Sequence, residues 1–181
     1  MINLLSKKAR THIEEDLTPY EILQDDFLKN DFLTATDRKK LKSIKEAFES
    51  YTLSKIERLT VFSSSFIGEH LVRLMADKTQ EEVLVLSLNT KNEVISIDRV
   101  FKGSLNTSVA HPREIFKTAI SHSAARIILA HNHPSGDTDP SEADLSLTRR
   151  VVESGELLGI ECLDHFIIGR DYLSLREHGL M

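Results

Sequence analysis

The sequence predicts an α/β protein, with a mixed β-sheet flanked by helices and a small helical segment before it. Two observations predict this fold class. From residue 61 onward, helix-like and strand-like runs alternate in the order helix, two strands, helix, strand, helix, two strands. The strand-like runs are densely apolar, as expected of strands that are covered on both faces. We therefore expect a helical N-terminal segment over 1–60 and an α/β domain over 61–181.

The N-terminal segment is expected to hold a short and a long helix. The short one lies in YEILQDDFL at 20–28. The long one covers DRKKLKSIKEAFESY at 37–51, with Thr36 as a candidate N-cap. Its apolar residues recur at helical spacing on one face, and they are Leu41, Ile44, Phe48 and Tyr51.

The α/β domain is expected to begin with a helix and a β-hairpin. The helix lies in SFIGEHLVRLMADK at 65–78, after a serine that can cap it. Two strand-like runs follow, EVLVLSLN at 82–89 and VISIDRVFK at 94–102. The turn sequence TKNE separates them, so we expect the two strands to pair as a hairpin.

The remaining runs continue the alternation of helix and strand. They are a helix at 111–124, a strand at 126–131, a helix at 141–159 and strands at 160–169 and 172–175. Pro112 suits the first turn of its helix, where its missing N–H costs no hydrogen bond. Gly159 is expected to end the helix before it, because glycine adopts the left-handed conformation of a C-cap readily.

Composition excludes several classes of protein. A formal net charge of −5 gives no general attraction for nucleic acid. Because Cys162 is the single cysteine, the chain has no internal disulfide and no cysteine-based zinc framework. The longest apolar runs fall well short of the roughly 18 residues that would suggest a membrane span, and the N-terminus lacks a signal-peptide core. We expect a cytoplasmic protein without a membrane partner.

The run HNHPSGDTDPSEAD at 131–144 contains the residues best suited to chemistry. In a strand, side chains two residues apart point the same way, so His131 and His133 can aim at one point. Pro134 ends the strand, and the first turn of the following helix can carry Asp144 back over the strand end. Two imidazoles and one carboxylate suit Zn²⁺, and three protein ligands leave a position for water, as in catalytic zinc sites.

The same run has two other interpretations. Ser141 and Asp144 stand three residues apart before an apolar run, which is typical of a helix N-cap without any metal. That interpretation leaves the two histidines at a strand end unexplained. The letters HNH also suggest a nuclease, but nuclease sites of that name draw their ligands from separated elements, so this interpretation is weaker.

The motif resembles the H-x-H-P…S-x-x-D signature of JAB/MPN (JAMM) metalloproteases. HPREIF at 111–116, ILAHNHPSG at 129–136 and LDHFIIG at 163–169 are similar to the bacterial RadC group within that family. The resemblance covers residues 65 to 181 and implies the JAB/MPN (cytidine-deaminase-like) fold, with Zn²⁺ held by His131, His133 and Asp144. It also implies that Ser141 lies beside the water on the metal, where its hydroxyl would stabilise a developing oxyanion.

Hydrolysis by such a site needs a group that takes a proton from water and delivers it to the leaving amine. JAB enzymes place a glutamate for this task on an early strand, and the family pattern assigns it to Glu81, with Glu82 as the fallback. Neighbouring strand residues face opposite sides of a sheet, so only one of the two can serve. Alternatively, both are solvated charges at a strand entrance. Glu114 is a rival whose place in the first turn of a helix is also explained by the helix dipole.

His165 follows Asp164 in LDHFI, a pair that resembles one found in RadC proteins. A histidine within an apolar strand is usually a hydrogen-bonded core residue. A role behind the metal ligands is the alternative.

The N-terminal segment departs from the RadC pattern. RadC proteins usually begin with a helix-hairpin-helix-like region whose glycine-rich hairpin can bind phosphate, but residues 1–60 contain no glycine. The run RKKLKSIK at 38–45 holds five cations and no acid. These cations could contact a DNA backbone, or they could form a solvated helix face.

We therefore expect a RadC-like, zinc-dependent metallohydrolase that cleaves peptide or isopeptide bonds in an unidentified peptide or protein substrate. The alternative is a DNA-repair-associated accessory protein whose JAB domain is a metal-binding scaffold without protease activity. Phosphodiester hydrolysis is a weaker third option, because the ligands for a second metal ion are missing.

Overall fold

The computed structural model describes residues 2–13, 17, 22–23, 25–56, 59–103 and 110–181. They divide into two compact units, one within residues 1–52 and one within 53–181. Among the described residues, no helix is both long enough and apolar enough to span a membrane.

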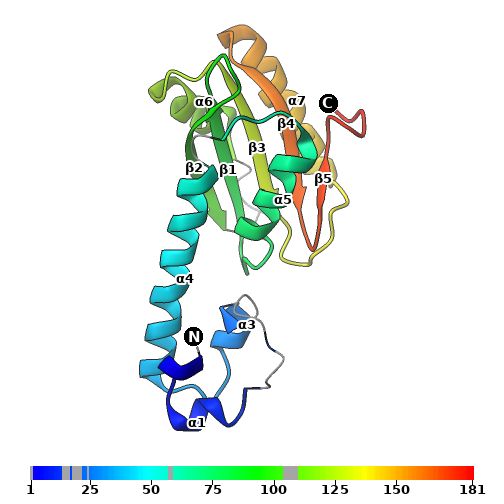
Figure 1. Ribbon diagram of the computed structural model, residues 1–181. Coiled ribbons are helices and arrows are strands. Elements are labelled where there is room, and N and C mark those ends of the chain that lie inside the picture. The colour runs from blue at the N-terminus through cyan, green and yellow to red at the C-terminus, as the bar shows by residue number, and fades with distance from the viewer. Residues whose placement is uncertain (1, 14–16, 18–21, 24, 57–58, 104–109) are drawn as a thin grey trace. The chain divides into compact units, whose positions relative to one another are not determined.

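The first unit is helical. It contains the 3₁₀ helix η1 (Ile2–Leu4), α1 (Lys7–Arg10), α3 (Asp25–Leu28) and the greater part of α4 (Ala35–Ile56) (Figure 1). The short helix expected at 20–28 is described over α3, while residues 20, 21 and 24 lie outside the described residues. Leu5, Ala9, Ile22, Leu33 and Leu41 belong to the small hydrophobic core of this unit.

The carboxylate of Asp37 joins the starts of two helices. It accepts hydrogen bonds from the backbone N–H and hydroxyl of Ser6, the N-cap of α1, at 2.7 and 2.6 Å. It also accepts from the backbone N–H and hydroxyl of Thr34 at 3.0 and 2.6 Å, while the Asp37 N–H donates to the Thr34 hydroxyl oxygen. Thr34 therefore caps α4, and the expected cap at Thr36 is wrong. Thr34 has an acidic residue three positions later to complete a reciprocal pair of hydrogen bonds, whereas Thr36 already lies inside the helix.

The apolar face expected on α4 is buried only in its first half. Leu41 is fully buried and Ile44 packs against the same cluster, whereas Phe48 and Tyr51 are 46% and 58% exposed. The reason is length. A helix of 22 residues is about 33 Å long at 1.5 Å per residue, and the small core of the first unit lies against its beginning.

The second unit is built on a five-stranded mixed sheet. Its strands are β1 (Glu81–Leu88), β2 (Val94–Gly103), β3 (Arg126–Asn132), β4 (Glu161–Ile168) and β5 (Tyr172–Ser174), in the spatial order β2-β1-β3-β4-β5. β3 and β4 are parallel, and the other neighbouring pairs are antiparallel. The predicted α/β class, the mixed sheet and the hairpin of β1 with β2 are confirmed.

Helices cover both faces of this sheet. α5 (Ser64–Met75) lies on one face, and α6 (Pro112–Ser121) and α7 (Glu142–Leu158) lie on the other (Figure 1). Even-numbered residues of β1, such as Leu84 and Leu86, belong to the core under α5, whereas Val83 and Val85 belong to the core under α6 and α7. β3 alternates in the same way, which decides the face on which each polar residue at the strand ends lies.

The helices of this unit begin and end where local signals predict. Ser63 caps α5, Pro112 occupies the first turn of α6, and Gly159 ends α7 in a left-handed conformation with φ of 68°. The single cysteine, Cys162, is a buried core residue, and burial raises the pKa of its thiol to about 12.

Candidate metal centre

Two histidines lie at the end of β3 on the face that α7 covers. His131 is one residue before the strand end. It is separated from Ile127 and Leu129 by an even number of residues, so its side chain lies on the same face of β3 as theirs, which pack under α6 and α7. His133 follows the strand directly. His131 is 1% exposed, and the His133 side chain is 15% exposed, so the pair lies at the edge of the core with one ring reachable from solvent.

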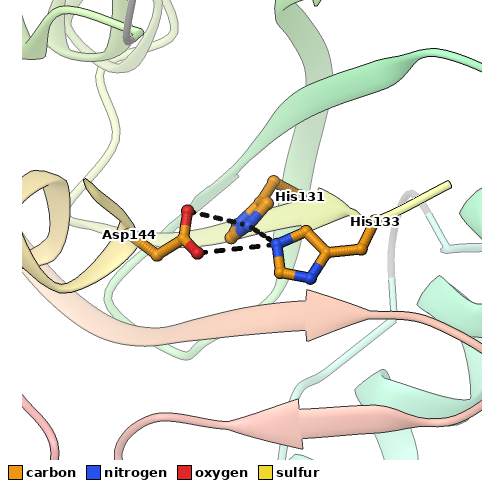
Figure 2. Close-up of side chains that lie close together, drawn as sticks. All are labelled: His131, His133 and Asp144. Atoms are coloured by element: carbon orange, nitrogen blue, oxygen red, sulfur yellow. Dashed lines mark hydrogen bonds and ion pairs between the residues drawn. The ribbon is translucent and has the colours of Figure 1, made fainter. Parts of the chain in front are cut away.

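Asp144 comes from the first turn of α7 and meets both rings. Its Oδ1 lies 3.1 Å from His131 Nε2, and its Oδ2 lies 3.5 Å from His133 Nε2. The two Nε2 atoms lie 2.9 Å apart. Figure 2 shows the two histidines projecting toward the carboxylate of the facing helix. The structure thus brings together the three residues predicted from the spacing of the motif.

The separation of these donor atoms fits one small cation. Zinc binds histidine nitrogen and carboxylate oxygen at about 2.0–2.1 Å, so neighbouring ligand atoms of a tetrahedral site lie about 3.3 Å apart. The two Nε2 atoms lie 2.9 Å apart, and the carboxylate contacts them at 3.1 Å through Oδ1 and at 3.5 Å through Oδ2, so each contact is near that value; with one donor atom taken from each residue, all three lie within 4.8 Å of one another. The donor set of two imidazoles and one carboxylate also suits zinc. The three residues could therefore hold a metal ion; their role as ligands stays a prediction.

Hydrogen bonds and charge at the site favour an ionised carboxylate. Burial alone would raise the pKa of the Asp144 carboxyl, but its contacts with His131, His133 and Ser141 outweigh burial and hold the pKa far below the usual range. The pKa of His133 is raised, chiefly by the hydrogen bond to Asp144. A smaller contribution to that rise comes from the negative charge of Glu81. The site therefore concentrates negative charge where a cation would bind.

The outer nitrogen of each histidine has a partner behind the site. His133 Nδ1 lies 3.0 Å from the backbone oxygen of Asp137. His131 Nδ1 lies 2.9 Å from Nε2 of His165, which is fully buried on β4. His165 is thus a hydrogen-bonded residue of the core that directly contacts a predicted ligand. Burial lowers the pKa of His165 well below its ordinary value, so this ring is neutral.

Ser141 forms the helix cap that the second interpretation of the motif predicted. Its hydroxyl donates to Asp144 Oδ2 at 2.6 Å and accepts from the Asp144 N–H, while its own N–H donates to the same carboxylate oxygen at 2.7 Å. The cap and the cluster of ligand candidates coexist, because Asp144 offers one oxygen to Ser141 and the other to His131. The predicted role of Ser141 as an oxyanion donor stays a prediction.

Glu81, the predicted acid/base, lies at the start of β1 on the same face as the two histidines. β1 and β3 are antiparallel, and Val83 pairs with His131. Glu81 is two residues before Val83 in β1, and His133 is two residues after His131. Because the strands are antiparallel, these two steps lead in the same direction along the sheet. Glu81 also lines a surface hollow of about 330 Å³ together with Pro134 and Gly103. This register supports the assignment of Glu81.

Glu82, the fallback, points to the other face and is engaged there. It is 4% exposed, and its carboxylate forms ion pairs with Arg99 Nη1 at 3.0 Å and Lys102 Nζ at 3.1 Å, both from β2. The rival Glu114 pairs with its neighbour Arg113 at 3.1 Å on the exposed side of α6. Both glutamates therefore have structural roles that explain their charge.

Sequence reasoning missed two polar residues around the centre. Thr148 is fully buried and contacts His165; its spacing of four from Asp144 on the same helix was an available signal. Asn132, between the two histidines, faces the opposite side of the sheet and bonds to the backbone at the start of β1. No local signal pointed to those partners, because they lie at least 50 residues earlier in the chain.

The basic run at 38–45 is partly occupied by contacts within the first unit. Arg38 donates to the backbone oxygens of Leu28 and Asn30, and Lys40 donates to that of Leu4. These contacts turn two of the five cations toward protein oxygens. Contact with DNA by this run stays a prediction.

Comparison with known proteins agrees with the motif. Residues 61–180 match the model of a family described as the RadC-like JAB domain. A UPF0758 protein of Latilactobacillus sakei is 51% identical over 122 residues, covering 67% of this chain and 54% of the relative. A UPF0758 protein of Enterococcus faecalis is 49% identical over 128 residues, covering 70% and 55%. One of Clostridium botulinum strain Eklund 17B is 43% identical over 155 residues, covering 78% and 68%. The chain thus spans little more than half the length of the first two relatives.

Proposed function

Because the chain belongs to the family of the RadC-like JAB domain, we propose that it is a zinc-dependent hydrolase of peptide or isopeptide bonds. The observation that carries this proposal is the cluster of His131 Nε2, His133 Nε2 and the Asp144 carboxylate, with separations of 2.9 to 3.5 Å. A glutamate on the same face of the sheet supports a hydrolytic role over a purely structural one.

A bound zinc ion supplies a Lewis acid that polarises the scissile carbonyl and lowers the pKa of a water toward neutrality. The task of Glu81 is proton transfer. Its carboxylate would accept a proton from the attacking water and deliver that proton to the nitrogen of the leaving amine. The register of β1 with β3 supports this role, since it puts Glu81 on the same face of the sheet as His133, whose side chain is 15% exposed.

Ser141 would stabilise the negative charge that develops on the carbonyl oxygen. Its hydroxyl now donates to Asp144 Oδ2, so this role requires the hydroxyl hydrogen to rotate toward the substrate. The Asp144 oxygen would keep its hydrogen bond from the Ser141 backbone N–H, which limits the cost of the rotation. One well-placed oxyanion donor typically contributes about 10²–10³ to kcat.

The test measures metal content before activity. Untagged wild-type protein and the His131→Ala/His133→Ala double variant are incubated with zinc, dialysed and subjected to elemental analysis. We expect one zinc per wild-type chain and loss of zinc from the double variant. Absence of zinc from the wild type would contradict the proposal.

Activity is then measured on a mixture of peptides and branched isopeptides, with new amino termini identified by mass spectrometry. We expect cleavage by the zinc-loaded wild type and none by the double variant. Zinc-loaded protein that produces no new termini would contradict the hydrolase and favour a metal-bearing scaffold. Equal cleavage by both proteins would point to a contaminating peptidase.

A further inference from the structure

A chain of buried hydrogen bonds runs from the backbone of one predicted ligand to the ring of another. The hydroxyl of Thr148 lies 2.7 Å from the backbone oxygen of Asp144 and 2.7 Å from His165 Nδ1. His165 Nε2 lies 2.9 Å from His131 Nδ1. Thr148 and His165 are fully buried and His131 is 1% exposed, so water does not compete for these contacts.

The direction of each hydrogen bond follows from what each group can donate. A backbone oxygen only accepts, so the one hydroxyl hydrogen of Thr148 points to Asp144. The hydroxyl oxygen must then accept from His165 Nδ1–H. In a neutral imidazole the other nitrogen is an acceptor, so His165 Nε2 accepts from His131 Nδ1–H. His131 Nε2 is left with its lone pair directed at His133 and Asp144.

We propose that Thr148 and His165 are positioning residues that select the Nδ1–H tautomer of His131 and so prepare its Nε2 atom to bind the metal ion. The inference rests on the proposed metal centre and extends it to two residues that do not contact the ion. Asp144 acts at both ends of this arrangement, with its carboxylate at the centre and its backbone oxygen at the start of the chain of hydrogen bonds.

The opposite tautomer is disfavoured by the same contacts. With hydrogen on His131 Nε2, the N–H could donate to Asp144 Oδ1, 3.1 Å away, in the metal-free protein, but it would occupy the space of the metal ion, and His131 Nδ1 would need a donor from His165 Nε2. His165 Nδ1 would then need the hydroxyl hydrogen of Thr148, leaving two oxygens 2.7 Å apart with no hydrogen between them. Two oxygens held this close with no hydrogen between them repel each other, which disfavours this tautomer.

His133 provides an internal comparison. Its Nδ1 contacts the backbone oxygen of Asp137, which can only accept, so one local hydrogen bond selects the corresponding tautomer. His131 is deeper in the protein, and the group behind it is a histidine, which can donate or accept. The tautomer of His131 therefore depends on Thr148, the next group in the chain.

The first test is zinc affinity, measured on the full chain by competition with a chromophoric zinc chelator. Thr148→Val removes the hydroxyl and keeps the shape, whereas Thr148→Ser keeps the hydroxyl. We expect Thr148→Val to weaken zinc binding 10- to 100-fold, the range found for partners of metal-binding histidines, and Thr148→Ser to remain within about threefold of wild type. Equal affinities for the wild type and both variants would overturn the proposal.

A second pair of variants addresses His165. Gln in its place can accept from His131 Nδ1–H through its side-chain oxygen and donate to Thr148 through its amide, whereas Leu can do neither. We expect His165→Gln to bind zinc at least tenfold more tightly than His165→Leu. Equal loss in the two variants would mean that His165 only fills space.

The decisive readout is the tautomer itself. Long-range ¹H–¹⁵N NMR spectra of zinc-free protein with labelled histidine, at about pH 8.5, report which nitrogen of a neutral ring carries hydrogen. We expect hydrogen on Nδ1 of His131 in the wild type and in Thr148→Ser, and a mixture or the reverse in Thr148→Val. Hydrogen on Nε2 of His131 in the wild type would overturn the proposal even if every variant failed to fold.

These measurements separate the inference from the proposed function. A protein that binds zinc through a preset His131 and cleaves no peptide would contradict the hydrolase and leave the positioning role of Thr148 and His165 in place.

Discussion

The side-chain oxygen of Asn132 accepts a hydrogen bond of 2.8 Å from the backbone N–H of Glu82, a residue 50 positions earlier in the chain. The side-chain amide of Asn132 lies 3.4 and 3.2 Å from the backbone oxygens of Lys78 and Gln80, to which it donates. One side chain, placed between the two histidines, thus holds the segment that carries Glu81. The spacing of the acid/base from the ligands depends on these contacts.

Replacement of Asn132 by Ala should therefore affect turnover more than zinc binding. Without the three hydrogen bonds the start of β1 loosens and Glu81 loses its fixed position, while the ligands on β3 and α7 remain. We expect kcat to fall at least tenfold and zinc affinity to stay within about threefold, since small misplacement of a catalytic group can cost about 10² in rate.

Asn89→Ala is the matched control for this variant. Asn89 also holds backbone groups through its side chain, accepting from the N–H of Lys91 and Glu93 at the opposite end of β1. The Asn89→Ala variant should lower the free energy of unfolding by about 1–3 kcal/mol, as Asn132→Ala should, but it should leave kcat unchanged. Equal kcat values for the two variants would remove the positioning role of Asn132.

Glu81→Gln should retain zinc and lose turnover. The amide cannot accept the proton of the attacking water, and proton transfer by a positioned group typically contributes about 10²–10⁴ in rate. Zinc content by elemental analysis and cleavage of the peptide mixture check the two expectations. Turnover by Glu81→Gln at the wild-type rate would remove Glu81 from the mechanism.

Glu82→Gln is the matched variant on the other face of β1. It weakens the ion pairs with Arg99 and Lys102 and should lower the free energy of unfolding while leaving turnover within about threefold. If folded Glu82→Gln lost turnover while Glu81→Gln kept normal activity, Glu82 would be the acid/base in place of Glu81.

Asp144 and Ser141 can be separated as ligand and cap. Asp144→Asn keeps an oxygen that can accept from the N–H of Ser141, but a neutral amide is a poor ligand for zinc; we expect zinc affinity to fall at least tenfold. Ser141→Ala should cost the helix cap about 0.5–2 kcal/mol and leave zinc affinity within about threefold. Hydrogen exchange at the start of α7 and chelator competition measure the two effects, and zinc affinity unchanged in Asp144→Asn would count against the site.

Asp37 should make the first unit sensitive to acid. Hydrogen bonds from the hydroxyls of Ser6 and Thr34 hold the pKa of this carboxyl well below its usual range. Because the folded-state pKa is lower than the unfolded value of about 3.9, the carboxylate stabilises the fold above about pH 4 and loses this effect as the pH falls further. We expect Asp37→Asn to increase hydrogen exchange in α1 and at the start of α4 at pH 7, with a smaller difference from wild type at pH 3.

Asp31→Asn provides the control, because Asp31 is an exposed aspartate of the same unit. It should leave hydrogen exchange in α1 and α4 unchanged at both values of pH. A difference between wild type and Asp37→Asn that grows toward low pH would contradict the role given to Asp37.

Local patterns predicted the elements of the second unit well. Apolar alternation and helical spacing found its strands and helices, and Pro112, Ser141 and Gly159 marked helix ends, because capping and backbone conformation depend on neighbours only a few residues away. The first unit was harder. Of the two threonines near the start of α4, only Thr34 has an acidic residue three positions later, and the contact of that residue, Asp37, with Ser6, 31 residues earlier, also favours a helix that begins after Thr34.

The sequence by itself determined the fold class and the candidates for the centre, since the spacing of His131, His133 and Asp144 already places three candidate ligands on adjoining elements. Only the tertiary structure decided how the surrounding groups face it. The pairing of β1 with β3 turns Glu81 toward the histidines and Glu82 away. The parallel pairing of β3 with β4 brings His165 to His131, 34 residues away. No local pattern specifies such contacts, because they depend on which strands become neighbours and in which register.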